Sequence, residues 1–124
     1  MEAIAHRCSE FDQLLYARDV LQSAGQAILA VAHHLGGSFC SAIELLLACQ
    51  GHVVVSGLGK AGLVGQKISA TLASTGTPSL FLHPTEALHG DLGRVRPEDV
   101  ALLLSASGET EEIVRLVAAL VELK

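Results

Sequence analysis

Two short apolar runs in this sequence each end in a loop of small residues that opens a helical pattern. The run VVV at 53–55 leads into SGLG at 56–59, and VALLL at 100–104 leads into SASG at 105–108. Backbone N–H groups at the start of a helix lack partners within the helix, and the helix dipole adds positive charge there. Two such loops side by side favour an anion, so the pattern predicts a phosphate-binding crevice.

Polar side chains beside these loops fit the same chemistry. Ser107 stands where a helix N-cap is expected and Thr110 follows three residues later, so their hydroxyls and the N–H groups of 108–110 could surround a phosphate. Lys60 falls in the first turn of a predicted helix, where a cation opposes the dipole and has no capping role. It suits a phosphate or a developing enolate oxygen. A plain N-cap at Ser107 and an ordinary exposed lysine at Lys60 remain the alternatives.

The elements that must position these loops form an α/β fold. Apolar runs without polar alternation are typical of parallel strands that are buried on both faces. Strands are predicted at 52–56, 79–82 and 100–105, and helices at 60–74, about 84–89 and 109–123. Right-handed crossovers then give a parallel sheet with flanking helices. Because the loops after the first and third strands are alike, the first strand is expected between the other two, at a switch point.

The sequence before the sheet predicts two helices. One covers 9–35, with Ser9 and Asp12 as a capping pair and Gly36-Gly37 as a left-handed C-cap. Ser38 is expected to cap the second helix, which ends at Gln50-Gly51. The first helix carries apolar residues at alternating steps of three and four, a heptad-like seam. These are Leu14, Ala17, Leu21, Ala24, Ile28, Val31 and Leu35. Packing within the chain and a symmetric contact between subunits are equally compatible with this seam.

Composition restricts the class of protein. The 124 residues suggest one domain, with helices in 1–50 and the first part of an α/β domain in 51–124. Half of the residues are hydrophobic, the net charge is −5 and only 3% are aromatic, which argues against nucleic-acid binding. No apolar run approaches the ~20 residues of a membrane span. Three widely spaced cysteines and no evident signal peptide suggest reduced thiols in the cytoplasm.

The glycines of the first loop also match a dinucleotide-binding pattern. Gly57, Gly59 and Gly62 fit G-x-G-x-x-G. The second predicted strand, however, runs into His83 and offers no acidic residue for a ribose. A nicotinamide-cofactor site therefore stays a weak alternative.

Several motifs in one order resemble the sugar-isomerase (SIS) family, and within it the D-arabinose-5-phosphate isomerases. The resemblance covers roughly 50–117. It rests on GLGK at 57–60, STGTP at 74–78, HP at 83–84, HGDLG at 89–93 and SASGET at 105–110.

This resemblance implies a fold, an assembly and a reaction. The fold is a five-stranded parallel sheet between helix layers, flavodoxin-like in its three layers, assembled as a homodimer or homotetramer. The reaction is the interconversion of D-arabinose 5-phosphate and D-ribulose 5-phosphate, which feeds bacterial lipopolysaccharide sugar synthesis. A sugar phosphate is the implied partner, and no cofactor is required. A sugar-phosphate-binding regulatory module without turnover is the alternative.

The family motifs assign roles to particular residues of this chain. Lys60, His89 and Glu112 match active-site positions. A second group matches substrate or phosphate contacts: Gly59, Gly76, Thr77, His83, Ser105, Ser107, Gly108 and Thr110. His83 is also the position of an optional zinc. From the residues alone, His83 and His89 with Glu86 and Asp91 nearby could ligate a metal.

Two departures from the family matter for catalysis. Ala106 stands where relatives often carry a polar amide, and a further Glu and His from the second half of the family's module have no counterpart here.

The third strand, 100–105, is an apolar sheet edge without a guarding Lys or Pro. We therefore expect that the chain is a fragment or that a partner chain supplies the missing strands.

Overall fold

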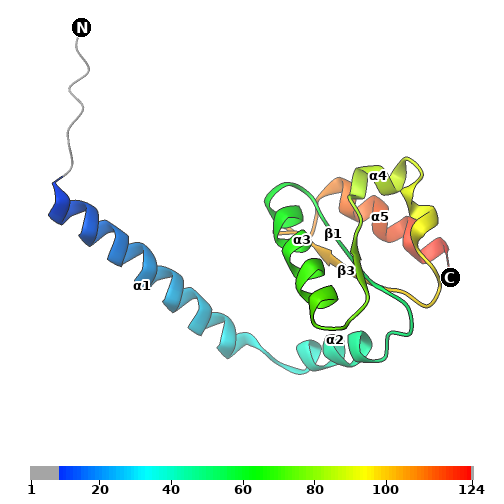
Figure 1. Ribbon diagram of the computed structural model, residues 1–124, viewed down its shortest axis with the longest axis horizontal. Helices are drawn as coiled ribbons and strands as arrows, with labels where there is room; N and C mark the ends of the chain where they lie inside the picture. Colours follow the sequence, from blue (N-terminus) through cyan, green and yellow to red (C-terminus); the bar gives the residue numbers. More distant parts are fainter. Residues whose placement is uncertain (1–8, 124) are drawn as a thin grey trace, which may run out of the picture. The chain divides into compact units, whose positions relative to one another are not determined.

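The computed structural model describes residues 9–123. Cys8, one of the three cysteines predicted to be reduced thiols, lies outside these residues. The chain divides into two compact units between Ser41 and Ala42. In chain order the elements are α1 (Glu10–His34), α2 (Gly37–Leu47), β1 (Val53–Gly57), α3 (Gly59–Ser74), β2 (Ser79–Phe81), α4 (Pro84–Leu88), a 3-10 helix η1 (Asp91–Arg94), β3 (Val100–Leu104) and α5 (Glu111–Glu122), most of them labelled in Figure 1.

Helix α1 begins as predicted but ends differently. The Ser9 hydroxyl accepts the N–H of Asp12 at 3.1 Å, and the Asp12 carboxylate accepts the N–H of Ser9 at 3.3 Å, a reciprocal capping box. The predicted glycine cap is wrong, because the helix ends at Leu35 in extended backbone with φ −67°. The Gly36 carbonyl then accepts the N–H groups of Phe39 and Cys40. This leaves Ser38 inside the first turn of α2 rather than at its cap.

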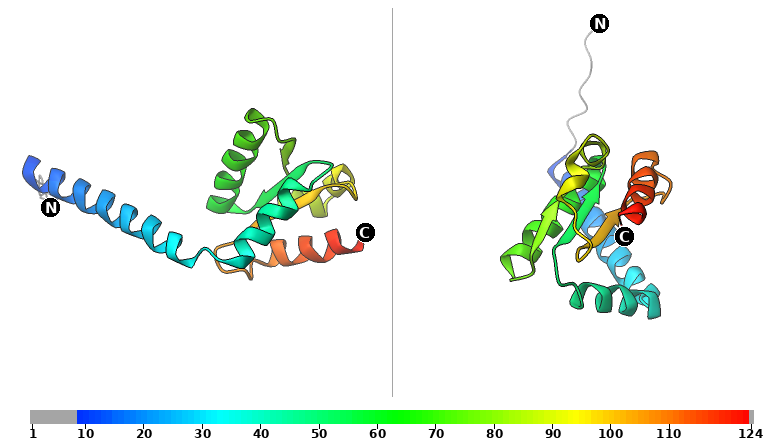
Figure 2. Two further views of the ribbon diagram at one scale, coloured as in Figure 1. Left: turned by 90° about the horizontal axis from the view of Figure 1, so that it is seen from below. Right: turned by 90° about the vertical axis from the view of Figure 1, so that its right-hand side faces the viewer.

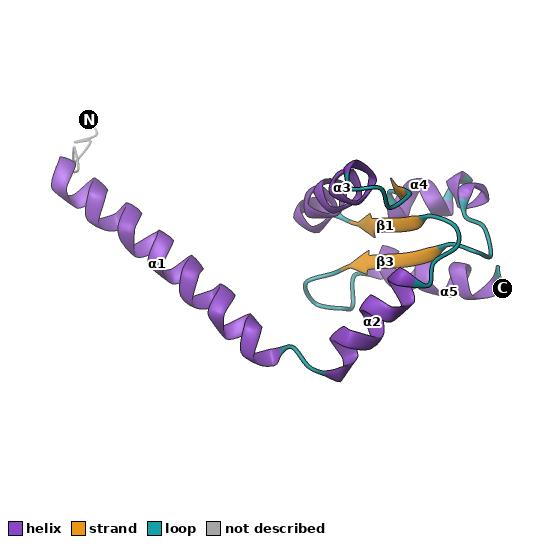
Figure 3. Cartoon of the chain, turned by 60° about the horizontal axis from the view of Figure 1, so that its bottom comes forward, coloured by secondary structure: helices purple, strands orange, loops and turns teal. Residues whose placement is uncertain are grey.

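The sheet has the predicted parallel order β2-β1-β3, with β1 in the centre. Figure 3 shows β1 and β3 side by side and pointing the same way. Figure 2 shows α3 and α5 on opposite sides of the strands, with α4 beside α5. This is the three-layer α/β arrangement that the apolar runs predicted.

Alternate residues of β1 face the two helix layers. Val54 packs with Leu82, Ala87 and Leu116 in a fully buried cluster under α4 and α5. Val55, also fully buried, lies against α3, where a Cβ at Gly65 would meet its side chain at 3.3 Å. Burial on both faces explains why β1 is uniformly apolar up to Ser56.

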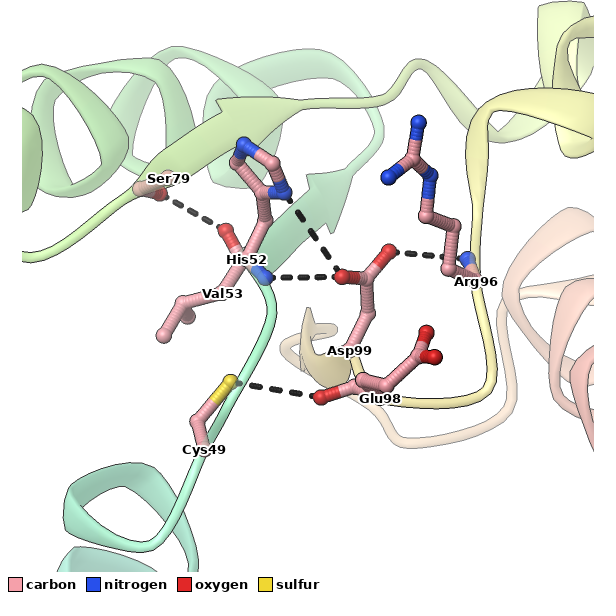
Figure 4. A network of polar contacts seen from close by, with 7 residues as sticks. All are labelled: Cys49, His52, Val53, Ser79, Arg96, Glu98 and Asp99. Carbon is pink, nitrogen blue, oxygen red and sulfur yellow. Dashed lines mark hydrogen bonds and ion pairs between the residues drawn. The ribbon is translucent and has the colours of Figure 1, made fainter.

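A buried carboxylate ties the amino ends of β1 and β3 together (Figure 4). Asp99, whose side chain is 1% exposed, accepts the N–H of His52 at 2.7 Å and the N–H of Arg96 at 2.8 Å. Burial opposes the charge, but these two donors outweigh it, so the pKa of Asp99 lies below its ordinary value. A Cβ at Gly51 would collide with this carboxylate and with the Glu98 carbonyl, which explains the glycine there.

Both outer strands, β2 and β3, are edges of the described sheet, as predicted. An apolar groove of about 320 Å³ runs beside β3 and α5. Its lining includes Ala101, Leu103, Val117, Leu120 and Val121.

Within 9–123, no single helix is long and apolar enough to cross a bilayer, although the bent pair α1 and α2 together has the length and composition of a span.

Candidate functional site

The strand register brings the two predicted phosphate loops to one edge of the sheet. Gly57 at the end of β1 pairs with Leu104 at the end of β3. Chains that leave neighbouring parallel strands at the same level begin about 5 Å apart. The loop 58–60 and the loop 105–110 therefore leave from adjacent points at the carboxyl edge, where α/β folds bind ligands.

The first loop is shaped by three glycines with separate structural tasks. Gly59 adopts a left-handed φ of +57°, which lets the chain turn from β1 directly into α3. A Cβ at Gly62 would lie 2.6 Å from the Gly57 carbonyl oxygen, and one at Gly57 would lie 2.9 Å from the backbone of Ala61. Close packing of α3 on β1 thus accounts for the G-x-G-x-x-G spacing without a dinucleotide.

Lys60 lies in the first turn of α3 and is exposed, with no hydrogen bond or ion pair to any residue of 9–123. The first N–H group of this turn that is bonded within the helix belongs to Gly62, which donates to Leu58. An unpaired lysine and N–H groups without a partner in the helix therefore occur together in the first turn of α3, an anion-favouring helix end.

The second loop is held by its own hydroxyls. The Ser105 hydroxyl accepts the N–H of Gly108 at 3.1 Å and lies 2.8 Å from the Thr110 hydroxyl. The Ser107 hydroxyl accepts the N–H of Glu109 at 3.1 Å. Gly108 sits at φ +75°, a conformation that favours glycine. These bonds hold the loop in a defined shape.

This arrangement corrects the predicted cap of the last helix. Helix α5 begins at Glu111 with Thr110 as its N-cap, so Ser107 is a turn residue three positions earlier. Two of the N–H groups expected to face a phosphate, those of Gly108 and Glu109, are already bonded inside the loop. The anion-favouring donors are instead the N–H groups of 111–113, because Val114 is the first residue of α5 to donate within the helix.

Glu112 differs from its neighbour in the first turn of α5. Glu111 is exposed and lies 3.7 Å from Arg115, one turn along the same helix. Glu112 is half-buried and has no partner among the described residues. A carboxylate that is partly buried at a site edge and unpaired is available for proton transfer.

Two histidines bracket α4, just beyond the end of β2. His83 is the N-cap residue of α4 and directly follows the buried Leu82, whose N–H donates to the Val55 carbonyl of β1. His89 is the C-cap residue, and its backbone N–H donates to the Glu86 carbonyl at 3.1 Å, whereas its exposed side chain makes no hydrogen bond within 9–123. Their separation of six positions corresponds to about 9 Å of helix rise. Within 9–123, no three His, Cys, Asp or Glu side chains cluster closely enough to hold a metal.

The turn Gly76–Thr77 lies at the other edge of the sheet. It precedes β2, and the carbonyl of Pro78 accepts the N–H of Val53 at the start of β1. A five-residue parallel strand such as β1 spans about 16 Å between the two edges. One copy of this unit therefore does not bring Gly76 and Thr77 to Lys60 and Ser107, and their contact with substrate stays a prediction.

Two buried polar atoms near the carboxyl edge lack partners in the described part of the chain. They are Oγ of Ser56, a fully buried residue of β1, and Nδ1 of His83. A proton on Nδ1 would leave a buried N–H without an acceptor, which favours the tautomer that carries the proton on Nε2. Nothing in the sequence indicated that the Ser56 hydroxyl is buried, because this depends on the elements that pack around the end of β1.

The family comparison bears directly on these motifs. Residues 46–124 match the model of the SIS domain. The chain belongs to the SIS-domain family. Among its relatives, arabinose 5-phosphate isomerase KpsF of Escherichia coli O6:H1 is 52% identical over 104 residues, covering 83% of this chain and 32% of that protein. Arabinose 5-phosphate isomerase KdsD of Pseudomonas aeruginosa is 58% identical over 90 residues, covering 73% of this chain and 28% of that one.

A solved SIS structure has the same architecture. The E. coli CFT073 protein c3406 in complex with A5P superposes with a TM-score of 0.89 at 40% identity, covering 94% of this chain and 62% of that chain. The chain spans about a third of the length of the curated relatives named above.

Proposed function

We propose that this SIS domain belongs to an aldose–ketose isomerase that interconverts D-arabinose 5-phosphate and D-ribulose 5-phosphate. The observation that carries the proposal is the register of β1 with β3, which sets two anion-favouring helix starts side by side at one sheet edge. Relatives about half identical carry the name arabinose 5-phosphate isomerase, and a solved neighbour was determined with A5P.

In this proposal the phosphate lies between the starts of α3 and α5. The phosphate pairs with the Lys60 ammonium and accepts hydrogen bonds from the free N–H groups of 111–113. The hydroxyls of Ser105, Ser107 and Thr110 maintain the conformation of the second loop. Gly59 and Gly108 provide the turns that let the backbone approach the phosphate. A phosphate held at one end fixes the distance of the reacting carbons from the loop.

The isomerisation moves a proton between C1 and C2 of the sugar through an enediolate. A base removes a carbon-bound proton, and a donor or cation stabilises the oxygen that becomes negative; general acid–base help contributes about 10²–10⁴-fold. His89 and Glu112 are the candidates for the base, because neither side chain has a partner among residues 9–123. His83, with its Nε2–H directed away from the buried Nδ1, is suited to donate to a substrate oxygen.

We propose that the reaction needs no cofactor and that zinc at His83 is optional. Within residues 9–123, no group of three possible ligands gathers near His83, so the proposed reaction does not depend on a zinc held by these residues alone. No step of the proposed reaction therefore runs through a metal.

The surroundings of the reaction are also part of the proposal. We place the protein in the cytoplasm, in the supply of lipopolysaccharide sugars, and as a homodimer or homotetramer. The open edge of β3 and the groove beside it are suited to further strands, supplied by additional chain or by another subunit. Such strands would also bring the further Glu and His that the family motif requires.

A sugar-phosphate-binding regulator is the second candidate function. The regulator needs only the two loops, whereas an isomerase also needs unpaired proton-transfer groups. The free side chains of Lys60, His89 and Glu112 favour the isomerase.

The deciding experiment measures ribulose 5-phosphate formed from arabinose 5-phosphate, with binding followed separately by calorimetry. Lys60→Met is expected to weaken sugar-phosphate binding and turnover, while Lys67→Met, on the same helix but bonded only to Thr71, leaves both unchanged. Binding without turnover in a chain that carries the complete SIS domain would favour the regulator. Failure to bind any pentose 5-phosphate would overturn both functions.

A further inference from the structure

Helix α1 presents an apolar seam that nothing in its own compact unit covers. The helix has no buried residue. Leu21 is 72% exposed, Ile28 71% and Val31 61%. No charged residue occurs between Val20 and Ala32. An exposed apolar surface of this length is typical of an interaction site.

We propose that α1 of a second copy of the chain packs against this seam. The two helices run antiparallel, and the residue numbers of any two facing positions add up to 45. The inference rests on the proposed homo-oligomer and identifies the surface and the register that build it. Three properties of α1 favour this antiparallel pairing.

The first property is the heptad pattern. Seam residues recur at steps of three and four from Leu14 to Leu35 without interruption. In an antiparallel pair, a seam residue that is followed by a step of three faces a partner residue that is followed by a step of four. The sum of 45 pairs Leu14 with Val31, Ala17 with Ile28 and Leu21 with Ala24, and the two-fold axis repeats each pair.

The second property is the size of the seam residues. Each of these three pairs joins a Leu or Ile to a smaller Ala or Val. A parallel, in-register pair would instead set Ala17 against Ala17 and Ala24 against Ala24, between layers of paired leucines. Such alternation of underfilled and crowded layers packs poorly, because cavities and overpacking both cost stability.

The third property is the charge at the two ends. The first turn of α1 carries Glu10 and Asp12, and the last turn carries His33 and His34. The antiparallel register brings the acidic turn of each copy to the same end as the histidine turn of its partner. A parallel pair would gather four carboxylates at one end, and the helix dipoles would also repel each other.

Disulfide trapping tests the register. In a background without the native cysteines, chains with Ala17→Cys are mixed with chains with Ile28→Cys and oxidised. A cross-linked dimer is expected as the main product of the mixture. Neither variant alone should cross-link, because two copies of position 17 lie 11 residues apart, about 16 Å. A disulfide needs Cα atoms within roughly 7 Å.

The matched control is the pair Asp19→Cys and Gln26→Cys. These positions also add up to 45 but lie on the outer side of the helix, so they should remain reduced. Cross-linking of Ala17→Cys with itself would show a parallel pair and overturn the proposal. No cross-link in the mixture, with or without flotation of the chain on phosphatidylglycerol vesicles, would overturn it as well. The isomerase assay is run on the same samples, so a wrong register and a wrong activity are distinguished.

Discussion

The polar groups at the amino ends of the strands, here the amino edge, are hydrogen-bonded, whereas those at the carboxyl ends, the carboxyl edge, are largely unpaired in the described part of the chain. At the amino edge, Asp99 is buried and bonded to the backbone of both neighbouring segments. At the carboxyl edge, the side chains of Lys60 and Glu112 have no partners within residues 9–123, and neither has the side chain of His89 at the end of α4. The same three strands thus end in a satisfied clip on one side and in unpaired functional groups on the other. The hydrogen bonds of the buried carboxylate stabilise the amino edge, whereas the unpaired side chains contribute no such bonds.

The largest expected effect is on turnover at the carboxyl edge. His89→Asn should lower kcat by about 10²–10⁴-fold, because one acid–base group is lost, without changing the free energy of unfolding. Steady-state kinetics on arabinose 5-phosphate and urea denaturation measure the two quantities in a chain with the complete SIS domain. His34→Asn, on α1, is the control. Equal kcat values for both variants would remove His89 from the reaction.

The next effect concerns the amino edge. Asp99→Ala should lower the free energy of unfolding by about 2–4 kcal/mol, because two charge-assisted hydrogen bonds disappear and two N–H groups lose their acceptor. Glu98→Ala is the matched control, since that neighbouring side chain is exposed. Urea denaturation compares the pair. A difference below about 0.5 kcal/mol, the usual range for surface substitutions, would show that the clip is not structural.

Acidification should weaken the same clip. The pKa of Asp99 is lower in the folded state than in the unfolded chain, so its contribution is complete above the unfolded value near 4 and declines as the pH falls through the folded value. Stability measured between pH 6 and 3 should therefore fall more steeply in the parent chain than in Asp99→Asn. Parallel curves for the two proteins would contradict this linkage.

The smallest effect separates packing from function at Ser56. Its hydroxyl is buried without a partner, so Ser56→Ala should raise the free energy of unfolding by about 1 kcal/mol. Thermal denaturation gives the shift. Ser69→Ala is the contrast, because the Ser69 hydroxyl is bonded to Ser79 at 2.9 Å and its loss should destabilise. A loss of stability in both variants would show that Ser56 has a partner in solution.

Local patterns predicted most of the elements. The apolar runs located β1, β2 and β3 to within a residue or two, and Ser9 with Asp12 marked the start of α1. Predictions failed where several caps were compatible with one sequence. Ser107 and Thr110 are both good N-caps, and only the packed loop, in which Ser105 bonds Thr110, selects Thr110.

The candidate site could be predicted in part. Similar loops after two strands predicted that 56–60 and 105–110 would meet, and the register of β1 with β3 brings them together. The position of Gly76–Thr77 at the far edge follows from chain direction, which motif matching does not consider. The enclosure of Ser56 Oγ depends on contacts among residues distant in the sequence, so no local pattern could have revealed it.

By itself, the sequence determined the parallel three-strand order, because burial and turn formation act on short stretches, and its motifs pointed to SIS membership and to the candidate site residues. Only the tertiary structure decided which polar groups are satisfied and which remain free. Asp99 lies just before β3 and Glu112 lies in the first turn of α5, and both carry a carboxylate. Whether such a group finds backbone donors or stays unpaired depends on how the strands line up in space.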